Sequence, residues 1–185
     1  MPFIKVIEYA EAEGELKLIY DELVSKRGKL AEVHKIQSLN PESIVKHMDL
    51  YMTVMFSKSP LSRAQREMIA VVVSVANNCE YCQTHHEQAL NHYWKDDEKI
   101  KTLKRDFSKV DISSVDLKLC ELAWNLTRIP SVSTQSLIEV LKADGLDDRA
   151  ILDATLVIAY FNFVNRLVLG LGVNLESDKG EGYKY

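Results

Sequence analysis

The segment 77–90, with the sequence NNCEYCQTHHEQAL, contains two cysteines and two adjacent histidines. Cys79, Cys82 and His86 fall within one expected helix. At about 100° per residue, the second cysteine lies about 60° and the histidine about 20° from the first, so all three share one face. His85 points about 120° away from Cys79 and is the less suitable partner. His86, the second histidine of the pair, is therefore the one that can reach the thiols.

Both cysteines stand in the expected first turn of that helix, where unpaired backbone N–H groups and the helix dipole stabilise a thiolate. We therefore expect a lowered pKa and raised reactivity for a Cys-x-x-Cys pair at this position. A neighbouring histidine can carry a proton to or from the sulfurs. The pattern indicates thiol–disulfide or peroxide chemistry, in which one sulfur is oxidised and the other resolves it as a disulfide.

Glu67 is a further candidate, because it lies in an apolar helical segment that offers a carboxylate little polar company. A buried carboxylate needs a partner, and a raised pKa would suit a proton relay with His86. The alternative interpretation is a surface glutamate near a helix start, which the helix dipole favours.

Zinc binding is the main rival interpretation, since the three motif residues together with Glu67 could close a tetrahedron. Such sites normally draw a second ligand pair from elsewhere, and Cys120 is the only other cysteine. Plain packing of two buried cysteines is a further alternative. We expect Cys120 itself to be a core residue, because it shares a helix face with large apolar residues.

The elements that must position these residues are helices, since apolar residues recur at helical spacing almost throughout the chain. Ser62, with Gln65 three residues later, predicts a capping box at the start of the helix that carries the glutamate. Asn77 and Asn78 favour a turn. A new helix should therefore begin at or near Cys79.

Other helix starts are predicted at Pro41 after Asn40, and at three more capping positions: Ser113, Ser133 or Thr134, and Asp147. Gly145 is a plausible C-cap, and the last helix should run to about Gly170. We expect one all-α domain of about eight helices over 1–185. It would comprise an N-terminal helical extension at about 1–57 and a motif-bearing core at about 60–175.

The helix after Pro41 is expected to carry its apolar stripe inward, with these members: Ile44, Met48, Tyr51, Met52 and Met55. The remaining histidines have no polar constellation in the sequence and are expected at surface or boundary positions: His34, His47 and His92.

Composition limits the class of protein. Hydrophobic residues make up 46% and charged residues 27% of the 185 residues, which is typical of a globular chain with a full core. The net charge of −4 has interspersed signs and does not indicate a surface for nucleic acid or anionic membranes.

Charge comes too early for a signal peptide, and the longest apolar stretch is broken by three polar residues, Asn162, Asn165 and Arg166. We expect a cytosolic protein, in which a close cysteine pair is more often catalytic or metal-binding than structural.

The motif resembles that of the AhpD-like alkylhydroperoxidases, within the carboxymuconolactone decarboxylase superfamily. The family pattern begins with a glutamate, followed after eleven residues by a cysteine. Two residues, of which the second is tyrosine, separate this cysteine from another, and a histidine follows after three more residues. Every spacing is matched in this chain, by Glu67, Cys79, Tyr81, Cys82 and His86. The segment 159–176 and the ending Gly-Tyr-Lys-Tyr are similar to the peroxidase-related branch, so the resemblance covers most of the chain.

This resemblance implies a role for each motif residue. Cys82 would be oxidised to a sulfenic acid by a hydroperoxide. Cys79 would donate a proton and then resolve the sulfenic acid, while Glu67 and His86 would form the proton relay. AhpD itself has a second histidine just before the second cysteine, where this chain has Tyr81, so a shorter or different relay is expected.

The resemblance also implies a hydroperoxide substrate, a lipoyl- or thioredoxin-like dithiol electron donor, and a homo-oligomer (dimer, trimer or hexamer). Self-association agrees with apolar helices that a thin helical monomer would not readily cover. No cofactor or metal is expected, and neither nucleic acid nor membrane is expected as a partner. A non-enzymatic thiol redox sensor and a decarboxylase-like member of the superfamily stand as alternatives, although such decarboxylases lack the cysteine pair.

Overall fold

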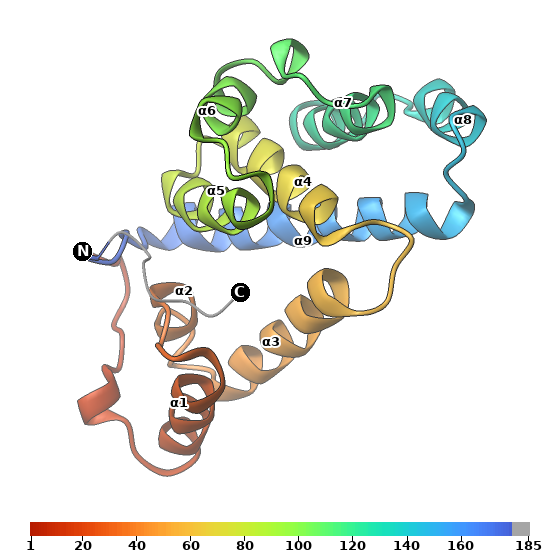
Figure 1. Cartoon of the computed structure of the whole chain (residues 1–185). Coiled ribbons are helices and arrows are strands. Elements are labelled where there is room, and N and C mark those ends of the chain that lie inside the picture. Colours follow the sequence, from red (N-terminus) through yellow and green to blue (C-terminus); the bar gives the residue numbers. More distant parts are fainter. Residues whose placement is uncertain (179–185) are drawn as a thin grey trace.

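The computed structural model describes residues 1–178 (Figure 1). All regular elements in that range are helical, which confirms the expected all-α fold. The α-helices are α1 Gly14–Arg27, α2 Glu32–Lys35, α3 Pro41–Phe56, α4 Arg63–Ala76, α5 Glu80–Trp94, α6 Asp97–Arg105, α7 Ser114–Arg128, α8 Gln135–Ala143 and α9 Asp148–Leu171. Two short 3₁₀ helices lie at Tyr9–Glu11 and Phe107–Lys109.

The helix that carries the glutamate begins as predicted. The Ser62 hydroxyl accepts from the Gln65 backbone N–H at 3.2 Å, and the Gln65 side-chain oxygen accepts from the Ser62 N–H at 2.9 Å. This reciprocal box satisfies two N–H groups that a helix start leaves free. After α4 the chain turns at Asn78, whose φ of 55° is left-handed, and Cys79 is the N-cap of α5.

Three other predicted boundaries are confirmed. Pro41 is the first residue of α3, and the side chains of Ser113 and Asp147 cap α7 and α9. Thr134 is the N-cap of α8, and Gly145 follows that helix with a left-handed φ of 98°.

The core is centred on α4, which packs against α5, α7 and α9. Nearly every side chain of α4 is buried, in agreement with its continuous apolar run. In Figure 1, α9 runs through the molecule with α4 to α7 on one side and α1 to α3 on the other. The N-terminal helices therefore face the motif-bearing helices across α9.

By length and composition, α9 is the one helix within residues 1–178 that could cross a membrane. Its apolar residues instead pack against α3, α4, α7 and α8. Asn165, in the middle of α9, is fully buried and accepts from the Asn77 side-chain amide at 3.0 Å. Such a buried amide network is typical of a core helix.

Two expectations for α3 are wrong. Met52 is 43% exposed, because the buried stripe of α3 runs through Ile44, His47 and Met55 instead. The histidine in that stripe, expected at the surface or boundary, is only 5% exposed because α3 packs it against α9. Cys120 is fully buried in the core, as expected.

Candidate active site

The two motif cysteines meet at the N-terminus of α5. Cys79 is the N-cap, and its N–H donates to the Ser74 carbonyl at 2.9 Å, which closes the turn after α4. Cys82 follows in the first turn of the helix. Both are free thiols, and their exposed fractions are 0% and 2%. The pair is therefore shielded from bulk solvent and sits where backbone N–H groups favour negative charge.

The two thiols share a hydrogen bond that separates their pKa values. The side-chain hydrogen bond with Cys82 lowers the pKa of Cys79, although burial opposes this. The same hydrogen bond, followed by burial, raises the pKa of Cys82 well above its usual value. The expected lowering thus holds for Cys79 and is wrong for Cys82, because a thiol that donates to a neighbouring thiolate keeps its proton. Cys79 is the sulfur that ionises first.

Glu67 is fully buried and doubly partnered. Its Oε1 accepts from Arg63 Nε at 2.8 Å and Nη2 at 2.5 Å, and its Oε2 lies 2.7 Å from His86 Nδ1. Burial alone would raise the pKa of Glu67, but the charges and hydrogen bonds of His86 and Arg63 together lower it. The expected lack of polar company, the raised pKa and the surface alternative are all wrong, because Arg63 lies one turn earlier on the same face of α4.

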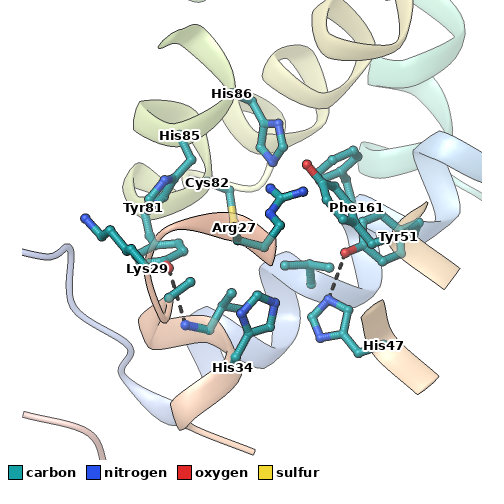
Figure 2. Close-up of a pocket in the computed structure, with 14 residues that line it drawn as sticks. Arg27, Lys29, His34, His47, Tyr51, Tyr81, Cys82, His85, His86 and Phe161 are labelled. Atoms are coloured by element: carbon teal, nitrogen blue, oxygen red, sulfur yellow. Dashed lines mark hydrogen bonds between the residues drawn. The ribbon is translucent and has the colours of Figure 1, made fainter. Parts of the chain in front are cut away.

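The contact with Glu67 orients the His86 ring. An ionised carboxylate can only accept hydrogen bonds, so the proton of a neutral His86 stands on Nδ1 and Nε2 remains available. The ring packs edge-on against Phe161, with centroids 4.4 Å apart. Within the described residues no hydrogen bond joins His86 to either sulfur, but His86 and Cys82 line the same pocket. One member of each pair, Cys82 and His86, thus faces a shared cavity (Figure 2).

This pocket has a volume of about 80 Å³ and is formed by three groups of elements. Helix α5 supplies Tyr81, Cys82, His85 and His86, and α9 supplies Tyr160, Phe161 and Val164. The N-terminal segment supplies Arg27, Lys29, Ala31, Val33, His34, His47 and Tyr51. One water needs roughly 10–15 Å³ by this kind of measure. The cavity therefore has room for a small organic molecule.

A hydrogen-bonded chain behind the pocket was not foreseen from the sequence. Gln37 Nε2 donates to the Val33 carbonyl at 2.8 Å, which fixes the orientation of the amide, and the same nitrogen lies 2.8 Å from His47 Nδ1. That ring nitrogen must accept, so the His47 proton stands on Nε2, which lies 2.7 Å from the Tyr160 hydroxyl. Burial lowers the pKa of His47 to about 4, so the ring is neutral near pH 7. Tyr160 accepts this bond and keeps its own proton for another partner.

Tyr81 and His85 are tied to the C-terminal segment. The Tyr81 hydroxyl donates to Glu176 Oε1 at 2.9 Å, and His85 Nε2 lies 2.9 Å from Glu176 Oε2. Burial would raise the pKa of Glu176, but the bonds and charge of His85 contribute most to lowering it to about 2. The Tyr81 oxygen also accepts from the Val33 N–H at 3.3 Å. Tyr81 therefore joins α5 to α2 and the C-terminal segment.

The part of the chain that the structure describes offers no set of ligands for the zinc site considered as an alternative. Across residues 1–178, no three side chains of His, Cys, Asp or Glu converge where they could hold a metal ion. Although Glu67 and His86 meet, the carboxylate is engaged by Arg63 on its other side.

A profile of the carboxymuconolactone decarboxylase family matches residues 44–105, which include Glu67, both motif cysteines and His86. No curated protein matches the chain.

Solved structures share this fold over nearly the whole chain. An uncharacterized peroxidase-related protein from Silicibacter sp. TM1040 has a TM-score of 0.87 and 25% identity, covering 99% of this chain and 96% of that one. The alkylhydroperoxidase AhpD core of an uncharacterized peroxidase-related protein from Ralstonia eutropha JMP134 has a TM-score of 0.86 and 22% identity, covering 99% and 98%. The debrominase Bmp8, in complex with 2,3,4-tribromopyrrole, has a TM-score of 0.79 and 17% identity, covering 95% and 92%.

Proposed function

We propose that this chain is an AhpD-like member of the carboxymuconolactone decarboxylase superfamily, and that it is a thiol-dependent peroxidase that reduces hydroperoxides through Cys79 and Cys82. The observation that carries the proposal is that one pocket is lined both by Cys82, which is hydrogen-bonded to Cys79, and by His86, which is held by the buried Glu67. The thiols can supply two electrons, and the histidine can supply or take a proton.

The first step uses the proton that the two sulfurs share. Cys82 passes its proton to the Cys79 thiolate and becomes the nucleophile that faces the pocket. Its sulfur attacks the terminal oxygen of the hydroperoxide, the O–O bond breaks, and Cys82 becomes a sulfenic acid. The leaving alkoxide takes a proton from protonated His86 and departs as an alcohol. Glu67 stabilises that imidazolium through the 2.7 Å contact at Nδ1.

The second step resolves the sulfenic acid. Cys79 attacks the sulfur of Cys82, a disulfide forms, and the hydroxyl leaves as water with the proton that Cys79 gives up through His86. A dithiol donor of the lipoyl or thioredoxin type then reduces the disulfide by exchange, becoming a disulfide itself. We also propose a cytosolic location, because a reducing compartment supplies such donors.

Steady-state consumption of an organic hydroperoxide tests the function. We expect sustained turnover with a lipoyl or thioredoxin-like dithiol donor. Mass spectrometry after mild oxidation should show that a peptide spanning both cysteines has lost two hydrogen atoms. A single stoichiometric oxidation with no turnover under any dithiol donor would favour the redox-sensor alternative. Separate thiols that persist under peroxide would exclude both.

We further propose that the chain forms a homo-oligomer through the exposed face of α9. Leu152, Leu156 and Phe163 are exposed, and their spacing places them on one side of the helix. An apolar stripe of this kind is typical of an interface between copies. Sedimentation should give a mass of several chains that Leu156→Glu lowers, whereas Leu18→Glu, at an exposed leucine on α1, should not. A wild-type mass of one chain at micromolar concentration would reject this.

A further inference from the structure

The charged side chains that line the pocket are all positive. Its lining includes two cations, Arg27 and Lys29, and no carboxylate. Lys29 is paired with Asp178 at 2.6 Å. For Arg27, no ion pair with a carboxylate is found within the described part of the chain, so its charge is not offset there.

Arg27 is held in a position to receive a ligand. It is the last residue of α1, and Gly28 ends the helix with a left-handed φ of 82°. Its guanidinium carbon lies 5.3 Å from the centroid of Tyr51 and 5.8 Å from that of Phe56. In Figure 2 the side chain reaches into the pocket toward the space between His86 and Phe161. Both ring centroids lie within about 6 Å of the guanidinium, the range of cation–π attraction, and a guanidinium has five N–H donors with which to bind a ligand.

Two further polar groups at the pocket have hydrogen-bonding capacity that is not used. The Tyr160 hydroxyl accepts from His47 and keeps a proton to donate. The Nδ1 atom of His34 is buried without a hydrogen-bond partner in the described structure. Burial first, and then the neighbouring His47 and Arg27, lower the pKa of His34 to about 3, so this ring adds no charge. Buried polar groups without partners are rare in folded proteins and mark places where a ligand or water completes the bonding.

We propose that the substrate is an organic hydroperoxide that carries a carboxylate, with the carboxylate bound by Arg27 and the Tyr160 hydroxyl and the hydroperoxide group at Cys82. The inference rests on the proposed peroxidase function and names its substrate class. The aromatic rings of Phe161 and Tyr51 would contact the carbon chain between the two ends. Arg27 is therefore a specificity-determining residue outside the segment that carries the motif.

A matched pair of substrates tests this assignment. The acid and the methyl ester of one short hydroperoxyalkanoic acid differ only in the charge that Arg27 would bind. We expect the wild type to favour the acid over the ester in kcat/KM by at least about tenfold, the size of a charge-assisted hydrogen bond. Arg27→Gln should remove this preference, and Arg105→Gln, at an exposed arginine ending α6, should keep it. The inference would be overturned if the wild type had equal kcat/KM values for the acid and the ester, or if Arg27→Gln kept the wild-type ratio of the two values.

Binding without turnover separates this inference from the proposed function. Calorimetry of the reduced wild type with pentanoate and with methyl pentanoate needs no reaction. We expect the anion to bind more tightly than the ester, and Arg27→Gln to lose that difference while its melting temperature stays near that of the wild type. If no hydroperoxide is consumed but this difference is found, the anion site stands and the peroxidase proposal fails. If hydroperoxides are consumed and pentanoate binds no better than its ester, the peroxidase stands and the anion site fails.

Discussion

Two of the three walls of the pocket are built in different ways. The α5 wall, with α4 packed behind it, holds its chemical groups within one stretch of chain, and the Glu67–His86 contact of the relay spans 19 residues of sequence. The opposite wall comes from α1 to α3 and depends on bonds over long distances, such as the 113 residues between His47 and Tyr160. The family profile at 44–105 includes the whole first wall but neither Arg27 nor His34 of the second. The groups proposed to react are therefore positioned by local spacing, whereas the groups proposed to bind a carboxylate are positioned by tertiary contacts.

The largest effect should come from the thiols themselves. Cys82→Ser should abolish peroxide turnover, because serine cannot form a sulfenic acid. Cys79→Ser loses both the thiolate that takes the Cys82 proton and the resolving thiol. It should therefore be oxidised once, more slowly than the wild type, and then stop, leaving a sulfenic acid at Cys82 that a dimedone adduct reveals by mass spectrometry. Cys120→Ala should turn over like the wild type, since that thiol is buried in the core away from the pocket. Sustained turnover by Cys82→Ser would assign the reaction to another site.

Removing the buried carboxylate should have the next largest effect. Glu67→Gln keeps the shape of the side chain but cannot stabilise a protonated His86, so steady-state turnover should fall by at least about tenfold. Helical circular dichroism should stay near that of the wild type. The matched control is Glu80→Gln, which removes an exposed carboxylate from the first turn of α5. A wild-type rate in Glu67→Gln would make that residue structural and reduce the mechanism to the cysteines and His86.

His47, in the second wall, should make the free energy of unfolding depend on pH. Burial lowers the pKa of His47 from 6.5 to about 4, so the unfolded chain binds a proton in a pH range where the folded chain does not. The free energy of unfolding should therefore fall as the pH drops from about 6.5 to about 4, by up to about 3 kcal/mol from this group.

Denaturant titrations at several pH values measure this effect. His47→Gln should reduce the dependence between about pH 6.5 and 5, which lies above the range in which buried carboxylates such as Glu176 protonate. Part of the dependence should remain, because burial also lowers the pKa of His34, to about 3. His92→Gln, at an exposed histidine, should leave the dependence unchanged. An identical slope in His47→Gln and the wild type would show that the His47 ring does not titrate with unfolding.

The smallest effect is expected where the two walls are joined. Tyr81→Phe removes the hydroxyl that donates to Glu176 and accepts from the Val33 N–H. The free energy of unfolding should fall by about 2 kcal/mol, since two hydrogen bonds are lost and the usual net value of each is about 1 kcal/mol, as measured by denaturant titration. Turnover should fall less than in Glu67→Gln, since Tyr81 bonds to α2 and the C-terminal segment and not to the thiols. A loss of turnover equal to that of Glu67→Gln would place Tyr81 in the relay.

Local features of the sequence were sufficient for much of the fold. Ser62, Asn78, Ser113 and Asp147 have capping or turn preferences that act over one turn of chain, so they predicted helix boundaries without reference to the rest of the molecule. Helical spacing likewise placed both cysteines at the start of one helix. These interactions join residues that are close together in the sequence, and the side chains concerned have few alternative interactions.

Only the tertiary structure decided the electrostatics of the site and its second wall. The pKa of Glu67 depends on burial weighed against two charged partners, a balance that an apolar sequence pattern cannot reveal, although the four-residue spacing from Arg63 was a usable signal. Arg27, His47 and Tyr160 come together because α1, α3 and α9 pack around one cavity. No local preference of these three residues encodes that meeting, since it arises from burying the apolar faces of helices far apart in the chain.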